Sequence, residues 1–361
     1  MEKVNASVRG TNCGRRGLLS GAAGAAGLLA FSPRPARAKG RLAGERVVFA
    51  SWGGAYQDAE KAGYCDPFAR KTGATVIQDG PVDYAKLRTM VETGAPIWDV
   101  VDVQDFFVFT AAAGGLLEKI DTAGVDTKRI DPKFVHPYGV GNMVFSFNLG
   151  YNTTAIRQGH APQTWMDFFD LGRFPGPRSV RDMAQPMLEA ALLADGVQPN
   201  ALYPLDVDRA FRKLDSIKSH AVFWSSSSQS QQLLVDRSAV MGMINNGRAF
   251  DSIKKGAPLA ISWEQNLQAG DYLVIPKGSK HRNAAMALID EMTLPENQAE
   301  VANLMALAPT NQAAFKFIHA DISPWLSTFP ENDSKGIMID KDYWRDNLER
   351  LTEKWTAWKL S

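Results

Sequence analysis

Short apolar strands alternate with helical segments along nearly the whole chain after residue 45. The first pair is typical, because RVVFAS (46–51) has the pattern of a buried strand and a helical pattern follows over 55–70. Further strands are predicted at 75–78, 98–103, 143–149, 222–224, 239–244, 259–263 and 271–276, with helical segments between most of them. This alternation is typical of an α/β fold with largely parallel sheets, and 361 residues suffice for about two domains.

The first 38 residues have the composition of an export signal. Arg9, Arg15 and Arg16 precede a mildly apolar stretch of small residues (17–32), and Ala36-Arg37-Ala38 fits a small-x-small cleavage site. The Arg15-Arg16 pair resembles a twin-arginine signal, and the weak hydrophobicity of the stretch favours that route over an ordinary Sec signal with a chance arginine pair. Both interpretations predict a product outside the cytoplasm, in the periplasm.

The remaining chain has a mildly acidic charge balance and little that suggests catalysis. The signal holds six of the 40 basic and one of the 39 acidic residues, so the rest has a net charge of about −4. This charge argues against general nucleic-acid binding, and no apolar run after residue 40 approaches the about 20 residues that span a bilayer. The five histidines lack metal-ligand spacing, no Gly-x-Ser-x-Gly or Walker sequence occurs, and Cys65 has no disulfide partner in the mature chain. We therefore expect no enzyme, no catalytic residue, no metal and no cofactor.

The end of the first predicted strand has an unusual composition. Trp52, Gly53, Gly54 and Tyr56 lie between the strand and the helix that follows. A glycine pair at this point lets backbone N–H groups face a ligand at a helix N-terminus, and parallel sheets bind ligands at the carboxyl ends of their strands. The alternative is a simple turn with Trp52 packed beneath the helix.

From residue 46 to near its end, the chain resembles the periplasmic solute-binding proteins of ABC importers, of the spermidine/putrescine-binding type. The likeness rests on the order and spacing of several segments over about 300 residues. These segments are DPFARKTGATV, DYAKLRTMVETG, WDVVDVQ, YGVGNMVFSFNLGYN, PQTWMDFF, SAVMGMINNGRAF, GAPLAISWEQ, GDYLVIPKGSKHRNAAMALIDEMTLPENQAEVA and APTNQAA.

The resemblance implies the type II periplasmic binding protein fold, in which crossing hinge strands join two α/β lobes around a ligand cleft. It predicts a first lobe of residues 42–147 plus 248–315 and a second of 148–246 plus 316–361. The crossings are expected near 145–152, near 244–248 and beyond residue 310.

The resemblance also implies which residues bind the ligand. Trp52 and Tyr56, beside Gly53, match the aromatic residues of the first lobe, where cation–π attraction is worth about 0.5–2 kcal/mol. Five further matches are Gln104, Asp105 and Phe106 after the third strand, Asp182 in the second lobe, and Asp271, which matches an acid that holds an amine.

The chain departs from the polyamine-binding pattern at several positions. Asn245 and Ala269 stand where polyamine binders have tryptophan, and Pro186 stands where a glutamate is expected. Arg181 and Arg248 lie in the same neighbourhood, where either can bind an anionic group with two parallel hydrogen bonds. Trp263 and the following Glu264 are further candidates for the cleft.

The resemblance implies the binding component of an ABC importer, a monomer that delivers a small amine-bearing solute to a membrane permease. A polyamine such as spermidine or putrescine is the family's default ligand. The departures make a zwitterion, such as an amino acid, 4-aminobutyrate or an aminophosphonate, the alternative. An exported α/β enzyme is less well supported, because the sequence shows neither paired carboxylates nor a metal cluster by spacing. We expect neither nucleic acid nor a membrane surface as partner.

Overall fold

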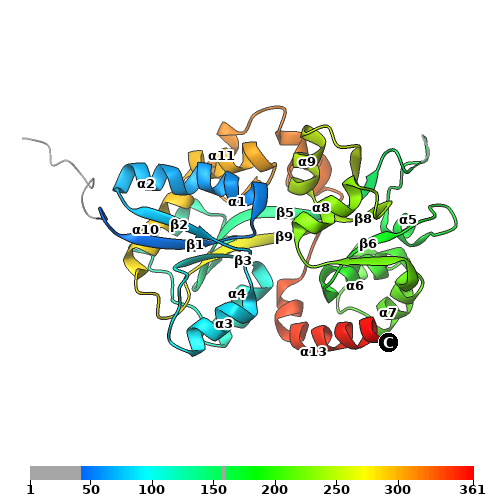
Figure 1. Ribbon diagram of the computed structural model, residues 1–361, viewed down its shortest axis with the longest axis horizontal. Coiled ribbons are helices and arrows are strands. Elements are labelled where there is room, and N and C mark those ends of the chain that lie inside the picture. Colours follow the sequence, from blue (N-terminus) through cyan, green and yellow to red (C-terminus); the bar gives the residue numbers. More distant parts are fainter. Residues whose placement is uncertain (1–41, 157–158) are drawn as a thin grey trace, which may run out of the picture. The chain divides into compact units, whose positions relative to one another are not determined.

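The computed structural model describes residues 42–156 and 159–361, so the predicted export signal lies outside the described residues. Within these ranges, one mixed sheet of eleven strands has the order β2-β1-β3-β9-β5-β8-β6-β7, and β4, β10 and β11 pair at its sides (Figure 1). The strands are β1 (Arg46–Ala50), β2 (Thr75–Asp79), β3 (Val100–Gln104), β4 (Val135–His136), β5 (Gly139–Asn152), β6 (Arg178–Arg181), β7 (Ala221–Trp224), β8 (Met241–Asn245), β9 (Leu259–Val274), β10 (Ala308–Pro309) and β11 (Ile337–Met338).

Helices follow most of the strands, as the sequence pattern predicts. The α-helices are α1 (Gly54–Glu60), α2 (Asp66–Thr72), α3 (Tyr84–Glu92), α4 (Asp105–Ala113), α5 (Trp165–Phe169), α6 (Ala184–Ala194), α7 (Val207–Asp215), α8 (Ser227–Val235), α9 (Asn246–Lys254), α10 (Arg282–Met292), α11 (Pro295–Met305), α12 (Pro330–Asp333) and α13 (Lys341–Leu360). Shorter turns are η1 (Lys61–Cys65, a π-helix that joins α1 to α2), η2 (Thr127–Arg129), η3 (Pro132–Phe134), η4 (Pro199–Ala201), η5 (Lys218–His220), η6 (Gln312–Phe317) and η7 (Ser323–Trp325).

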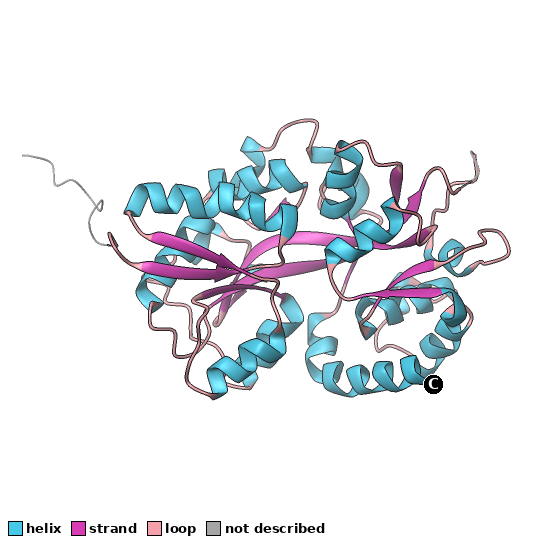
Figure 2. Cartoon of the chain, viewed as in Figure 1, coloured by secondary structure: helices cyan, strands magenta, loops and turns pink. Residues whose placement is uncertain are grey.

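Two long strands connect the two ends of the sheet. β5 and β9 pair antiparallel from Asn152↔Leu259 to Val140↔Leu273, with register shifts on the way. At one end of this pair, β3 hydrogen-bonds to the last residues of β9; at the other end, β8 hydrogen-bonds to the last residues of β5. Figure 2 shows the pair as the longest strands of the molecule. Each end of the sheet has its own parallel strands, β1–β3 and β6–β8.

Helices cover both faces at each end of the sheet. Figure 1 shows α1 and α2 on one face of β1–β3 and α3 and α4 on the other. At the second end, α8 and α9 lie on one face, and α6, α7 and α13 lie on the other. Between the strands and their covering helices lie apolar side chains such as Val47 and Phe49 of β1 and Val101 of β3, which are fully inaccessible.

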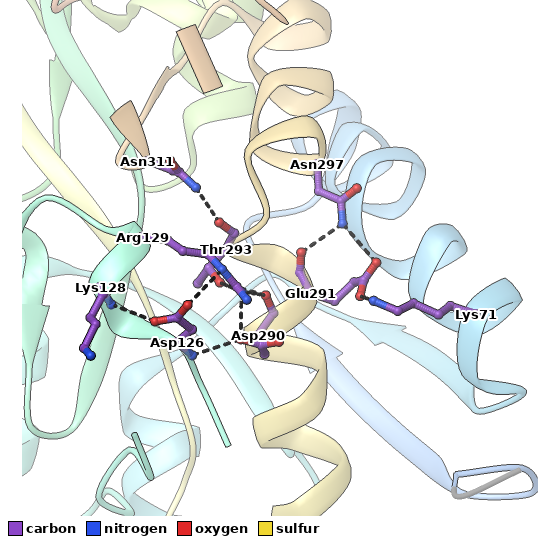
Figure 3. Close-up of polar contacts among 9 residues, drawn as sticks. All are labelled: Lys71, Asp126, Lys128, Arg129, Asp290, Glu291, Thr293, Asn297 and Asn311. Carbon is purple, nitrogen blue, oxygen red and sulfur yellow. Dashed lines mark hydrogen bonds and ion pairs between the residues drawn. The ribbon is translucent and has the colours of Figure 1, made fainter. Parts of the chain in front are cut away.

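Polar contacts tie the 126–129 loop and α2 to the C-terminal end of α10 (Figure 3). Nη1 of Arg129 donates to Oδ1 of Asp290 over 2.9 Å, and Nζ of Lys71 lies 2.5 Å from Oε2 of Glu291. Nδ2 of Asn311 donates to the carbonyl oxygen of Thr293 over 2.8 Å, which attaches the chain after α11 to the same point.

The structure differs from the sequence prediction around residues 244–248. This segment is the end of β8 and the start of α9 rather than a crossing strand. Ala249 of α9 packs in an apolar cluster with Leu234 of α8 and Ile244 of β8, so α9 belongs with the second set of strands. We place the second crossing in β9 instead. The sequence predicts the two halves of β9 as separate strands, because polar residues 264–266 interrupt the apolar pattern. The predicted lobe boundaries otherwise stay a prediction.

Candidate ligand-binding site

A cavity of about 590 Å³ lies where strands from both ends of the sheet terminate. β6, β7 and β8 end at Arg181, Trp224 and Asn245, all of which line it. Carboxyl ends of parallel strands are the usual position of ligand sites in α/β sheets. The other lining residues are Trp52, Tyr56, Pro81, Val82, Asp83, Tyr84, Lys86, Gln104, Phe145, Phe147, Ser225, Ser226, Ser227, Gly247, Arg248, Asp271, Met305 and Leu307.

Local sequence signals position several of these side chains. Gly53 has a φ of 73°, a left-handed conformation that favours glycine, and it turns the chain from β1 into α1 between Trp52 and Tyr56. Asp83 caps α3 by accepting hydrogen bonds from the N–H groups of Ala85 and Lys86, which fixes Tyr84 in the first turn. A capping box formed by Ser226 and Gln229 fixes the serine segment at the start of α8.

Asp271 is the one buried carboxylate on the wall of this cavity in the described part of the chain. It lies opposite Gln104 in the β3–β9 ladder and is only 6% exposed. Its side chain accepts no hydrogen bond from the described residues, and Oδ1 is buried without a partner. Burial raises the pKa of Asp271 well above its usual range, the carboxyls of Asp102, Glu60 and Asp105 raise it further, and Arg181 opposes them. A bound ammonium group supplies both the missing donors and the missing positive charge.

Two arginines line the same cavity. Nη2 of Arg181 donates to Oε1 of Gln104 over 2.9 Å, its guanidinium carbon lies 4.7 Å from the centre of the Phe147 ring, and Nη1 is buried without a partner. Nη2 of Arg248 donates to the carbonyl oxygen of Gly53 over 2.9 Å. Burial lowers the pKa of Arg181 to about 10, so this side chain keeps its charge at neutral pH. Both side chains retain N–H groups for an anionic ligand group.

Aromatic rings form another part of the cavity wall. The Trp52 and Tyr84 rings meet edge to face with centroids 6.0 Å apart, and Tyr84 stacks on Phe107 at 3.9 Å. The indole N–H groups of Trp52 and Trp224 are buried and donate to no described residue. A buried polar atom without a partner is energetically costly. These two N–H groups join the unpaired polar atoms of Asp271 and Arg181 at this cavity.

Six of the eleven ligand-binding residues predicted from the sequence line the cavity: Trp52, Tyr56, Gln104, Asn245, Arg248 and Asp271. Gly53 lies beside it and contributes its carbonyl oxygen to Arg248.

The other four predicted residues have different surroundings. Asp105 accepts from the N–H groups of Phe106 and Gly270, and Phe106 is fully buried against Tyr84. Asp182 faces α13, where Nε1 of Trp355 and Nζ of Lys359 lie 3.0 and 2.6 Å from its two oxygens. Trp263 is outside the lining, and the neighbouring Glu264 pairs with Lys335 at 2.6 Å.

Several lining residues are missing from the sequence-based set. Trp224 and Phe147 lie on strands that reach the cavity, and Tyr84 begins α3. Trp224 repeats the pattern seen at Trp52, a tryptophan at the end of an apolar strand followed by small residues. That repetition is the signal in the sequence that identifies it.

A second cavity of about 730 Å³ lies between α2 and α10 but has a different character. Several of its charged residues are paired, as in Lys71 with Glu291 at 2.5 Å and Arg282 with Glu118 at 3.8 Å. Paired charges at a surface groove leave little unsatisfied for a ligand to bind, so the first cavity is the candidate site although it is smaller.

Two kinds of feature are absent from the described ranges. Between residues 42 and 361, apart from the undescribed 157–158, no group of three or more His, Cys, Asp or Glu side chains is placed to hold a metal ion. No helix in the same ranges is long and apolar enough to cross a membrane.

Comparisons with known proteins agree on one class of relatives. Residues 63–331 match the family model described as bacterial extracellular solute-binding protein. A gamma-aminobutyric acid-binding protein of Pseudomonas aeruginosa is 32% identical over 321 residues, which cover 87% of this chain and 91% of the relative. A spermidine/putrescine-binding periplasmic protein of Salmonella typhimurium is 24% identical over 340 residues, 90% of this chain and 92% of the relative. The solved structure of a GABA receptor is 41% identical with a TM-score of 0.79, over 87% of this chain and 98% of the receptor chain.

Proposed function

Since the chain belongs to the bacterial extracellular solute-binding protein family, we propose that it binds a small zwitterion, 4-aminobutyrate (GABA) or a close analogue. In this proposal, the protein delivers the zwitterion to the membrane permease of an ABC importer. The observation that carries the proposal is the presence of Asp271 and Arg181 on one cavity wall, each with a buried polar atom that has no partner among the described residues.

The two charges define the two ends of the ligand. Asp271 pairs with the ammonium group in a cavity whose wall also includes the aromatic residues Tyr56 and Trp52. The free N–H groups of Arg181 and Arg248 bind the carboxylate. Four apolar side chains of the wall, Phe145, Phe147, Met305 and Leu307, contact the methylene chain between these ends.

The charge of the cavity wall argues for a zwitterion over a polyamine. Three cations, Lys86, Arg181 and Arg248, line the cavity, against two acids, Asp83 and Asp271. Asp83 already serves as the cap of α3. A diamine therefore brings its second ammonium group toward arginines rather than toward a carboxylate, and like charges oppose binding. The higher identity to the GABA-binding relative than to the spermidine/putrescine-binding relative supports the same choice.

The proposal includes the cellular setting. We place the mature protein in the periplasm after export through the segment 1–38, which carries the Arg15-Arg16 pair. The periplasmic relatives support this location. Mass spectrometry of the exported protein gives its first residue, and replacing Arg15 and Arg16 by lysine blocks export if the twin-arginine route is used.

Calorimetric titration with GABA tests the assignment of Asp271. Truncating one partner of a buried charge pair costs about 2–5 kcal/mol, so Asp271→Asn weakens GABA binding about thirtyfold or more. Glu264→Gln is the matched control, because Glu264 is an acid of the same strand whose partner is Lys335 at the surface. Equal affinities for the Asp271→Asn variant and the wild type contradict the proposed role of Asp271.

A further inference from the structure

Two more carboxyl groups are buried directly behind the cavity wall. Glu60 at the end of α1 and Asp102 in β3 are both fully inaccessible, and neither lines the cavity. Nδ2 of Asn142 joins them, at 3.1 Å from Oε1 of Glu60 and 3.3 Å from Oδ2 of Asp102. The hydroxyl of Tyr64 donates to Oδ1 of Asn142 over 2.8 Å, which fixes the orientation of this amide.

The donors around this pair are too few for two ionised carboxylates. Glu60 accepts from the Ser51 hydroxyl and Asp102 accepts from the Tyr56 hydroxyl at 2.8 Å, while Oδ1 of Asp102 is buried with no partner among the described residues. An ionised carboxylate has about four acceptor sites, and two carboxylates that share one amide repel each other. One proton held between Glu60 and Asp102 removes the repulsion and provides the missing donor.

The titratable and charged groups around the pair are mostly acidic. Tyr56 of α1, Tyr64 and Cys65 of η1, Asp271 of β9 and Arg248 of α9 reach it electrostatically. Asp105 of α4 and Arg181 of β6 act on Asp271. Arg248 donates to the Gly53 carbonyl and makes no ion pair with Glu60 or Asp102 in the described structure.

We infer that Glu60 and Asp102 hold one proton between them in the unliganded protein and release it to solvent when an ammonium group binds at Asp271. This inference rests on the proposed function. Only the bond between the proton and a carboxyl oxygen breaks, and the proton passes to solvent. The positive charge of the ligand therefore replaces the positive charge of the proton. Tyr56 is the link, because its ring lines the cavity while its hydroxyl donates to Asp102.

The electrostatics of the cluster support the exchange. Burial raises the pKa of Glu60, and the charge of Asp102 raises it further. Burial also raises the pKa of Asp102, against the hydrogen bond from Tyr56. A cation that arrives beside Asp271 favours the ionised form of all three carboxyls, and the weakest-held proton leaves.

Titrations of the purified protein with GABA in two buffers of unequal ionisation enthalpy test the exchange at pH 7. We expect the apparent binding enthalpies in the two buffers to differ by the amount that corresponds to release of up to one proton per ligand. The affinity for GABA should rise up to about tenfold per pH unit. Glu60→Gln removes the release. Glu291→Gln, a buried acid of α10 that pairs with Lys71, retains it. GABA binding with no enthalpy difference between buffers overturns the inference and leaves the proposed function standing.

An infrared spectrum at pH 7 tests the shared proton without any ligand. The wild type should show the C=O stretch of a protonated carboxyl, and this band should lose the intensity of one carboxyl in Glu60→Gln but not in Glu291→Gln. If GABA fails to bind, the proposed function is wrong. The infrared band then shows by itself whether Glu60 and Asp102 share a proton. A wild-type band that Glu60→Gln leaves unchanged overturns the inference.

Discussion

Arg181 and Gln104 are hydrogen-bonded across the cavity, with Nη2 of Arg181 2.9 Å from Oε1 of Gln104. Arg181 ends β6 and Gln104 ends β3, so the contact joins strands from the two ends of the sheet. Arg248 and the Gly53 carbonyl form a second contact of this kind, at 2.9 Å between α9 and the start of α1. The side chains that we assign to the ligand carboxylate therefore also hold the two sides of the cavity together.

Arg181→Met should weaken binding of GABA about thirtyfold or more, because the ligand carboxylate loses a buried, charged partner. Binding of 4-aminobutanamide, which lacks the negative charge, should change much less. Calorimetric titration of both ligands measures this selectivity. Arg173→Met is the control, since Arg173 also lies over an aromatic ring, Phe174 at 4.9 Å, but pairs with Asp167 away from the cavity. A parallel loss for both ligands argues against carboxylate recognition by Arg181.

Lys359→Met should lower the free energy of unfolding by about 1 kcal/mol. The Lys359–Asp182 pair at 2.6 Å is partly buried and works together with the Trp355 indole, which also donates to Asp182. Lys354→Met on the same helix breaks a more exposed pair with Asp208 at 2.8 Å and should cost less than about 0.5 kcal/mol. Urea unfolding compares the two, and an equal or reversed order contradicts the role given to Asp182 in attaching α13.

Arg181 and Asp182 show why part of the site escapes sequence reasoning. Successive side chains of a strand point to opposite sides, so Arg181 faces the cavity while Asp182, one residue later, faces α13. The family resemblance favours Asp182 as the ligand-binding residue, because the ligands it implies are amines. β6 itself, a four-residue strand of two arginines, a serine and a valine, has no apolar alternation that identifies it.

Part of the site is predictable from the sequence. Trp52, Tyr56, Gln104 and Asp271 follow from strand ends and from the family likeness, and all four line the cavity. Trp224 of β7, Phe147 of β5 and Tyr84 of α3 come from segments far apart in the chain, and only the folded sheet with its helices brings them to one cavity. The α/β class is predictable throughout, since it depends on local alternation alone.

Glu189→Gln should change the pH dependence of stability. Burial of the Glu189 carboxyl raises its pKa from 4.5 to about 7, against hydrogen bonds from Trp344 and Tyr203. Between these values the folded protein keeps a proton that the unfolded chain has lost, so this group reduces stability as pH rises from about 4.5 to 7. The full effect is about 3 kcal/mol. Unfolding free energies at pH 5 and pH 8 should therefore show the glutamine variant gaining on the wild type at pH 8. A constant difference between the two pH values contradicts this assignment.

In the proposed function, the cavity recognises a zwitterion, with its ammonium group at Asp271 and its carboxylate at Arg181 and Arg248. Calorimetric titration of the wild-type protein with GABA and with putrescine tests it most directly, because the two ligands share an amine and a four-carbon chain and differ in the group at the other end. We expect tight, saturable binding of GABA and much weaker binding of putrescine. Binding of putrescine at equal or higher affinity would contradict recognition of a zwitterion and would favour a polyamine as the ligand.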